Sequence, residues 1–223
     1  MYAPRNESKQ FEMCPTGWQL LVCTRAIDVG THWNPKKEKF ERKFMVGFES
    51  QHLMKEGDFA GEPFLVFSNF NYSMYQNAHL CGFIEDWRGK KFKSQEEADS
   101  FDLSKIIGQK AFANITRSED GRFTNIMTIG PVPDGMTAPE IKGKTILIDQ
   151  ANLDPKEIEK LSEKMRERVM SAKEQTEGNS HQAPVVQGMN TTNSGYQINS
   201  ENPGEGLTDA DAGFDDPIPG LDW

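Results

Sequence analysis

Cations interleaved with aromatic side chains are the most distinctive chemistry of this sequence. One such group occupies the segment 32–43 and contains Trp33, Lys36, Lys37, Arg42 and Lys43. Lysine and arginine neutralise backbone phosphates and release counterions, and an indole that stacks on a nucleobase contributes about 1–3 kcal/mol. The group therefore predicts contacts to a nucleic acid. A solvated loop with the Trp33 ring folded onto the domain fits the same residues equally well.

A second aromatic group follows the third apolar stretch of the chain. It consists of Phe70, Tyr72 and Tyr75, with Asn69 and Asn71 between them. Exposed rings there would extend a stacking platform for bases. We expect at least one of the three to belong to the core instead.

A third group flanks a short connection near the middle of the chain. Arg117, Arg122 and Phe123 offer two cations and an aromatic ring on either side of the turn. We expect the two arginines to contact phosphates if this face borders the binding groove. The turn itself carries Glu119 and Asp120, and this negative charge disfavours DNA at its tip.

Motifs for catalysis or metal binding are missing from the sequence. The four histidines lack metal-ligand spacing, and Cys14, Cys23 and Cys81 form no Cys-x-x-Cys pair. Neither a phosphate-binding Gly-x-x-x-x-Gly-Lys-Ser/Thr loop nor a Gly-x-Ser-x-Gly elbow occurs. We therefore expect no enzyme activity, no catalytic residue, no cofactor and no metal, with the cysteines acting as small buried apolar residues.

The beginning of the chain and its hydropathy bear on location. The first residues are polar, no apolar signal region follows them, and no apolar run is long enough to span a bilayer. The scattered cysteines suit a reducing compartment. We expect a cytoplasmic protein (host cytoplasm if viral) that is not secreted and has no membrane partner.

The pattern of apolar residues predicts strands at 18–27, 42–49, 64–72, 111–117 and 122–130, with 144–149 as a further candidate. In 42–49, Phe44, Val46 and Phe48 alternate with other residues, which indicates one buried face. The segment 28–39 is expected to be a loop. A helix after Ser73 as N-cap and a second helix over 96–107 separate the third strand from the fourth.

Three strands, a helix and two strands is the order of an OB-fold, a five-stranded Greek-key barrel with a helix between strands 3 and 4. We therefore predict a mainly β nucleic-acid-binding domain over residues 1–150. Another small α+β or β-barrel domain fits the same order.

The remainder of the chain is expected to form appendages. Asp154, Pro155 and Glu157 start an amphipathic helix that should run to about Lys173, within a segment 151–175. The helix should pack on the barrel with its charged face in water, although pairing with a second copy or contact with DNA would also suit it. Residues 176–206 are predicted to be a flexible linker.

The net charge is concentrated at the end of the chain. Residues 174–223 contain nine Asp or Glu and no Lys or Arg, which accounts for the whole net charge of −9. We predict an acidic partner-binding tip over 207–223. Its candidate contact residues are Phe214, Asp215, Asp216, Ile218, Pro219, Leu221, Asp222 and Trp223.

This tip resembles the ending of bacterial single-stranded DNA-binding proteins, which reads Asp-Phe-Asp-Asp-Asp-Ile-Pro-Phe. Phe214-Asp215-Asp216-x-Ile218-Pro219 matches that pattern with Pro217 as the one difference. Four residues, Gly220 to Trp223, follow the match. Either Ile218-Pro219 or Trp223 is therefore the candidate anchor.

Two stretches of the body form a further pattern, Leu80-x-x-Phe83-Ile84-Glu85-x-Trp87-Arg88-Gly89-Lys90-x-Phe92 and the stretch from Phe101 through Ile115 to Ile126. In these stretches the body resembles the OB-fold single-stranded DNA-binding proteins of tailed bacteriophages. This likeness implies single-stranded DNA as the ligand, in phage replication, recombination or repair. It also implies polymerase, helicase, primase or nuclease partners at the tail, and a homo-oligomer stays open. The main alternative is an acidic protein-interaction or DNA-mimic module that does not itself bind DNA.

Overall fold

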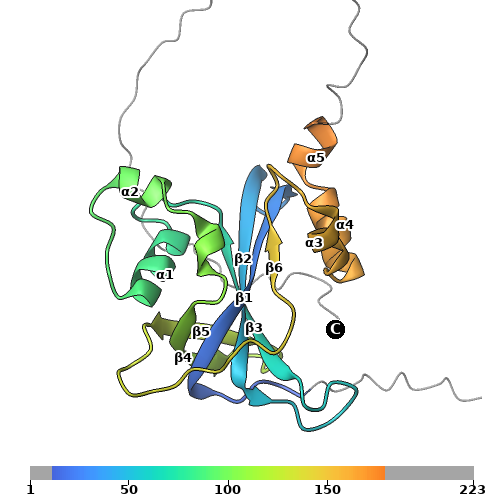
Figure 1. Cartoon of the computed structure of the whole chain (residues 1–223). Coiled ribbons are helices and arrows are strands. Elements are labelled where there is room, and N and C mark those ends of the chain that lie inside the picture. Colours follow the sequence, from blue (N-terminus) through green and yellow to red (C-terminus); the bar gives the residue numbers. More distant parts are fainter. Residues whose placement is uncertain (1–11, 179–223) are drawn as a thin grey trace, which may run out of the picture.

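The computed structural model describes residues 12–178 and is mainly β (Figure 1). Its strands are β1 (Gly17–Asn34), β2 (Lys39–Leu53), β3 (Pro63–Asn71), β4 (Lys110–Arg117), β5 (Thr124–Gly130) and β6 (Ile146–Ile148). The helices are α1 (His79–Arg88), α2 (Gln95–Asp99), the 3-10 helix η1 (Leu103–Ile106), α3 (Pro155–Glu159), α4 (Glu163–Met170) and α5 (Lys173–Gly178).

The strands form one open sheet in the order β3-β2-β1-β4-β5, with every pair along this path antiparallel. β1 pairs with β2 along one of its edges and with two strands in succession, β4 and then β6, along the other. Its first half pairs with β4, and beyond an irregularity at Cys23–Arg25 its second half pairs in parallel with β6. The edge strands β3 and β5 contact each other without joining in a hydrogen-bonded ladder.

Both β1 and β2 extend well beyond the predicted strands, so the expected loop at 28–39 is wrong over most of its length. Thr31 to Asn34 pair with Lys39 to Arg42, which leaves only residues 35–38 as a turn. Gly30 makes the extension possible, because it takes a φ of +87° next to an irregularity at Asp28–Gly30. The result is a two-stranded arm that projects from the sheet.

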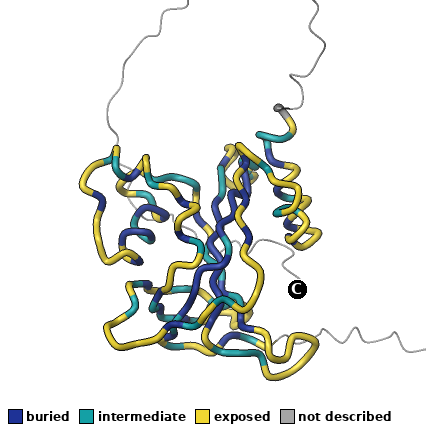
Figure 2. The backbone as a smooth tube through the Cα atoms, in the orientation of Figure 1, coloured by how far each residue is buried: buried dark blue, intermediate teal, exposed yellow. Residues whose placement is uncertain are grey.

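Two apolar cores lie on opposite faces of this sheet. The larger contains Leu21, Phe48 and the α1 residues Leu80, Ile84 and Trp87. The smaller is formed by the β1, β2 and β6 residues Ile27, Met45 and Ile148 with Leu161, Met165 and Val169 of the C-terminal helical segment. Figure 2 shows the buried backbone concentrated along the central strands.

The prediction of a single buried face on 42–49 is therefore wrong. Phe44, Val46 and Phe48 do face the larger core, but Met45 and Glu49 on the opposite face are buried as well. The C-terminal helical segment covers Met45, while the Glu49 carboxylate accepts hydrogen bonds from the backbone N–H groups of residues 142 and 143. The chain after β5 thus covers part of the outer surface of the sheet.

The helices between β3 and β4 are shorter than predicted. The N-cap of α1 is Ala78 and not Ser73, because Gln95 holds the intervening loop through the backbone of Met74 and Gln76. The expected helix at 96–107 is interrupted. The Asp102 carboxylate caps a new 3-10 turn by accepting from the Ser104 backbone N–H.

The C-terminal helix is divided into three pieces rather than continuous over 154–173. Its predicted start is confirmed, since the Asp154 side chain accepts from the Lys156 N–H and Pro155 occupies the first turn. Extended backbone at Ser162 then starts α4. α5 extends three residues into the predicted linker, and the rest of that linker and the acidic tip lie outside the described residues.

Within residues 12–178 no helix is both long and apolar enough to cross a membrane. The three cysteines are buried with free thiols, as expected of small apolar residues. Burial raises the pKa of the Cys23 thiol to about 12.

Candidate nucleic-acid interface

The β1–β2 arm carries an exposed aromatic pair. Trp33 and Phe40 face each other in register, and their ring centroids lie 5.2 Å apart in an edge-to-face arrangement. Both side chains are more than half exposed, at 52% and 54%. The pair offers two aromatic surfaces to solvent, the property that base stacking requires.

Cations lie next to this pair on the same face of the arm. The Lys173 Nζ of α5 is 4.7 Å from the centre of the Phe40 ring, and the Arg42 guanidinium lies 4.7 Å above the ring of Tyr72. Side chains alternate along a strand, so Arg42 and Phe40 share one face of β2. We name Trp33, Phe40, Arg42 and Tyr72 the aromatic face.

Arg42 is also an anchor within the fold. Its guanidinium donates to both carboxylate oxygens of Asp28, which is buried, and lies 3.7 Å from Glu174 of α5. The hydrogen bond with Asp28 raises the pKa of Arg42. Glu174 in turn accepts from the backbone N–H and hydroxyl of Thr31. The Arg42 charge is therefore largely offset by two carboxylates.

The opposite face of the arm is built around one buried carboxylate. Glu41 accepts a hydrogen bond from Lys43 at 2.9 Å and lies 3.5 Å from both Lys37 and Lys39. Asn34 donates to the same carboxylate at 2.9 Å. We name Lys37, Lys39 and Lys43 the lysine face.

Opposing effects act on the Glu41 carboxyl. Burial raises its pKa, but hydrogen bonds from Lys43 and Asn34 and the charges of Lys43 and Lys37 outweigh burial and lower the pKa to about 2. Glu41 therefore stays ionised at every physiological pH. It holds three lysines at one end of the sheet while cancelling one of their charges.

We expect the stability that Glu41 provides to be present above about pH 4.5 and lost as the pH falls toward 2. The folded carboxyl has the lower pKa, so the unfolded chain binds the proton first. In urea unfolding between pH 7 and pH 2.5, Glu41→Gln should therefore lose less stability on acidification than the wild type. The exposed Glu159→Gln serves as the control, and a Glu41→Gln protein that follows the wild-type pH profile would contradict the assignment.

The structure separates the predicted aromatic residues into different environments. Phe70 is buried at 7% exposure and packs 4.8 Å from Phe83, so it belongs to the core. Tyr72 is half-buried in the aromatic face. Tyr75 lies in the β3–α1 connection and is 64% exposed. Of the neighbouring amides, Asn71 accepts a hydrogen bond from Lys43 at 2.7 Å.

The third predicted group lies near the other end of β1, because β4 ends where β1 begins. Arg117 is exposed, with its guanidinium 3.2 Å from the sulfur of Met13. Arg122 pairs with Asp120 and lies 5.8 Å from the centre of the Phe123 ring, which is 43% exposed. Phe123 and the two arginines therefore flank the sheet at the β4–β5 hairpin, apart from the β1–β2 arm (Figure 1).

Three residues with the properties of a nucleic-acid contact were not predicted. Phe40 lies between the predicted loop at 28–39 and the predicted strand at 42–49, and nothing in its spacing indicates that it pairs with Trp33. Lys173 meets Phe40 only because α5 packs beside the arm. Trp18 is 55% exposed and stacks on Phe112 at 4.9 Å, on the outer surface of β1 and β4. Alternation along 111–117 is the one sequence signal for this second surface, because it turns Phe112 away from the buried Ala113 and Ile115.

No group of three His, Cys, Asp or Glu within residues 12–178 is arranged to hold a metal ion. No protein-family model, curated protein or solved structure matches the chain.

Proposed function

We propose that this chain binds single-stranded DNA without sequence preference, through the aromatic face and the cations around it. The observation that carries the proposal is the exposed Trp33–Phe40 pair beside Lys173, with Lys36 and Lys37 in the turn that joins the two strands. Stacking on an aromatic ring tolerates any base, because every base has a π-face. The nearby cations would follow the phosphates.

The order of the strands supports an OB-like identity for the sheet. An OB-fold joins three consecutive strands, places a helix before the fourth and brings the third strand beside the fifth. Here β1, β2 and β3 are consecutive neighbours, α1 precedes β4, and β3 contacts β5. In that fold the β1–β2 and β4–β5 connections border the oligonucleotide groove. Lys36 and Lys37 lie in the first connection with Trp33 at the end of β1 before it, and Arg122 and Phe123 lie in the second with Arg117 at the end of β4 before it.

The acidic tip completes the proposal. We propose that residues 207–223 recruit replication or recombination proteins to the coated strand, through their carboxylates and apolar side chains. A segment with such a composition docks into pockets that are both basic and apolar.

One observation favours the alternative of an acidic interaction module that does not bind DNA. Carboxylates already pair with the cations of the arm: Asp28 of β1 and Glu174 of α5 pair with Arg42, and Glu41 pairs with the lysine face. If these ion pairs persist, few charges are left for phosphates. A DNA-binding arm should show an affinity for oligonucleotides that falls as salt is added, whereas an interaction module that does not bind DNA should show no such affinity.

Replacing Lys36 and Lys37 together by alanine should make the dependence of log K on log salt concentration shallower by about 1.4, because each phosphate contact on a single strand contributes about 0.7. The measurement is fluorescence anisotropy with a labelled oligo(dT) across a series of salt concentrations. Lys55→Ala with Lys156→Ala makes an equal charge change away from the arm and should leave the slope unchanged. An unchanged slope in the Lys36/Lys37 variant would remove these lysines from the interface.

A further inference from the structure

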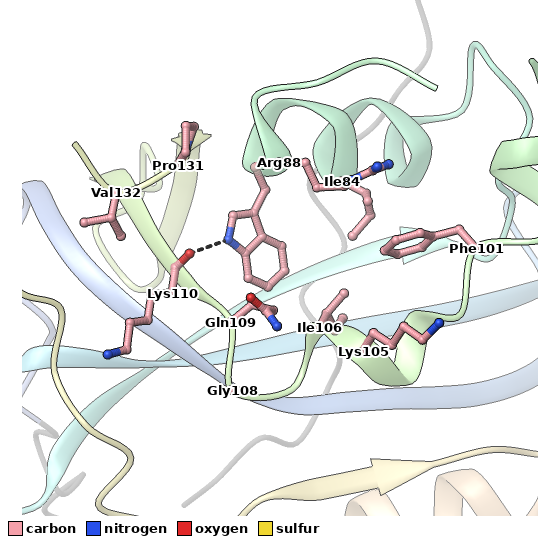
Figure 3. A pocket seen from close by; sticks show the side chains of 11 residues that line it. Ile84, Arg88, Phe101, Lys105, Ile106, Gly108, Gln109, Lys110, Pro131 and Val132 are labelled. Carbon is pink, nitrogen blue, oxygen red and sulfur yellow. Dashed lines mark hydrogen bonds between the residues drawn. The ribbon is translucent and has the colours of Figure 1, made fainter. Parts of the chain in front are cut away.

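A pocket of about 630 Å³ opens on the side of the sheet that carries α1, apart from the β1–β2 arm (Figure 3). Its apolar lining includes Ile84 and Trp87 of α1, Phe101, Ile106 and Val132. Trp87 is only 5% exposed, and its indole N–H donates to the Lys110 backbone carbonyl at 2.9 Å. This bond fixes the ring, so the pocket has a rigid aromatic wall.

Three exposed cations also line this apolar pocket, namely Arg88, Lys105 and Lys110. The Arg88 guanidinium lies over two rings, 4.5 Å from the centre of Phe92 and 5.2 Å from that of Phe101. Among residues 12–178 no carboxylate forms an ion pair with Arg88. Stacking therefore orients its charge and leaves its donors available to a ligand.

The two lysines are held only by ion pairs that solvent can screen. Lys105 is 4.0 Å from Asp102, and Lys110 is 3.3 Å from Glu140, whose side chain is 90% exposed. Such surface pairs contribute about 0–1 kcal/mol and exchange readily for a better-placed anion. The pocket therefore suits a ligand that combines an aromatic or aliphatic group with several negative charges.

We propose that this pocket binds the acidic tip of the same chain, residues 207–223. The tip carries Phe214, Ile218 and Trp223 as apolar groups, together with Asp215, Asp216 and Asp222 as anions. One large apolar side chain of the tip fills the space above Trp87 and Ile106. The flanking carboxylates accept hydrogen bonds from Arg88 and from one or both of the lysines.

The length of the connecting chain permits this contact. Gly178 and Phe214 are separated by 36 positions, which can span up to about 120 Å when extended. A folded unit of the described size has a radius of gyration of only about 15 Å. Tethering also raises the effective concentration of the tip to roughly the millimolar range. Even a weak intrinsic affinity would therefore keep the pocket occupied.

Docking of the tip does not require DNA binding, because the pocket shares no residue with the aromatic face. A docked tip would be withheld from other proteins that bind it. Partner recruitment would then require the partner to displace the tip from Arg88 and its neighbours.

The test uses the full chain labelled with 5-fluorotryptophan and observed by fluorine NMR without DNA. The chain has four tryptophans, and Trp223→Phe identifies the resonance of Trp223. We expect this resonance to differ from that of the isolated 207–223 peptide, and to return to the peptide position in the double variant Arg88→Glu with Lys105→Glu. The Trp87 resonance should shift in the same variant and when Phe214 and Trp223 are both replaced by alanine.

The control is Lys36→Glu with Lys37→Glu, which makes the same charge change on the β1–β2 turn. We expect it to leave the Trp223 resonance displaced. If that control and not the pocket variant releases Trp223, the tip lies on the aromatic face and the proposal is wrong. A wild-type Trp223 resonance at the peptide position would also overturn it, as would a displacement that disappears on dilution. Unchanged Trp18 and Trp33 resonances show that the variants are folded.

Discussion

Replacing Trp33 and Phe40 together by alanine is expected to weaken binding of single-stranded oligonucleotides by about 10- to 100-fold. Base stacking on one aromatic ring contributes about 1–3 kcal/mol, and these two rings form one exposed edge-to-face unit. The loss should be similar for oligo(dT) and for mixed sequences, because stacking does not read base identity. Fluorescence anisotropy at one fixed salt concentration measures it.

The matched control for this experiment is Trp18→Ala. Trp18 is as exposed as Trp33, at 55% against 52%, but it stacks on Phe112 over β4. If the β1–β2 arm is the binding surface, this control should retain affinity within a few-fold. Loss of binding in Trp18→Ala with retention in the Trp33/Phe40 variant would move the interface to the outer surface of β1 and β4.

Gly30→Ala is expected to destabilise the fold by about 2–5 kcal/mol. The φ of +87° at this position is unfavourable for a residue with a side chain, at about 1–2 kcal/mol. A Cβ there would also collide with Ala172 and would lie 2.9 Å from the Gln150 amide nitrogen. Overpacking of this kind costs about 1–3 kcal/mol. The change in the free energy of unfolding, measured in urea, reports the sum of the backbone and overpacking costs.

Gly17→Ala separates the two contributions. Gly17 has a φ of +106°, yet nothing lies within 4 Å of the position its Cβ would take. It should therefore show only the backbone cost, and the difference between the two variants measures the packing of Ala172 and Gln150 against Gly30 of β1. Equal destabilisation of both would mean that the C-terminal helices do not press against Gly30. The Glu174 contacts with Thr31 and Arg42 would then be weak as well.

Much of the strand content could be predicted from the sequence, since period-2 patterns and turn residues are local signals. The centres of β1 to β5, the β4–β5 connection and the Asp154 cap were all predicted. The extension of β1 and β2 could not be, because it depends on pairing between residues such as Thr31 and Arg42 and on the positive φ of Gly30. The buried outer face of β2 also depends on distant residues, those after β5.

The candidate site was predicted by residue type better than by geometry. Trp33 and the lysines of the turn were identified because cations and aromatics were adjacent in sequence. The Asp28–Arg42 ion pair was not predicted, since it joins residues 14 positions apart across a hairpin of unknown register. The ion pairs of Glu41 were not predicted because they depend on which face of β2 each side chain takes. Phe40 and Lys173 meet only in the folded chain, and sequence spacing gives no sign of that contact.

The most direct test of the account is a comparison of single- and double-stranded DNA. Wild-type protein would be titrated at low salt into fluorescently labelled oligo(dT) and into a duplex of equal length. We expect the single strand to be bound at micromolar protein or below, much more tightly than the duplex, with affinity that falls steeply as salt is added. Absence of single-strand binding at micromolar protein, or equal affinity for the duplex, would contradict the proposal that the β1–β2 arm is a single-stranded DNA interface.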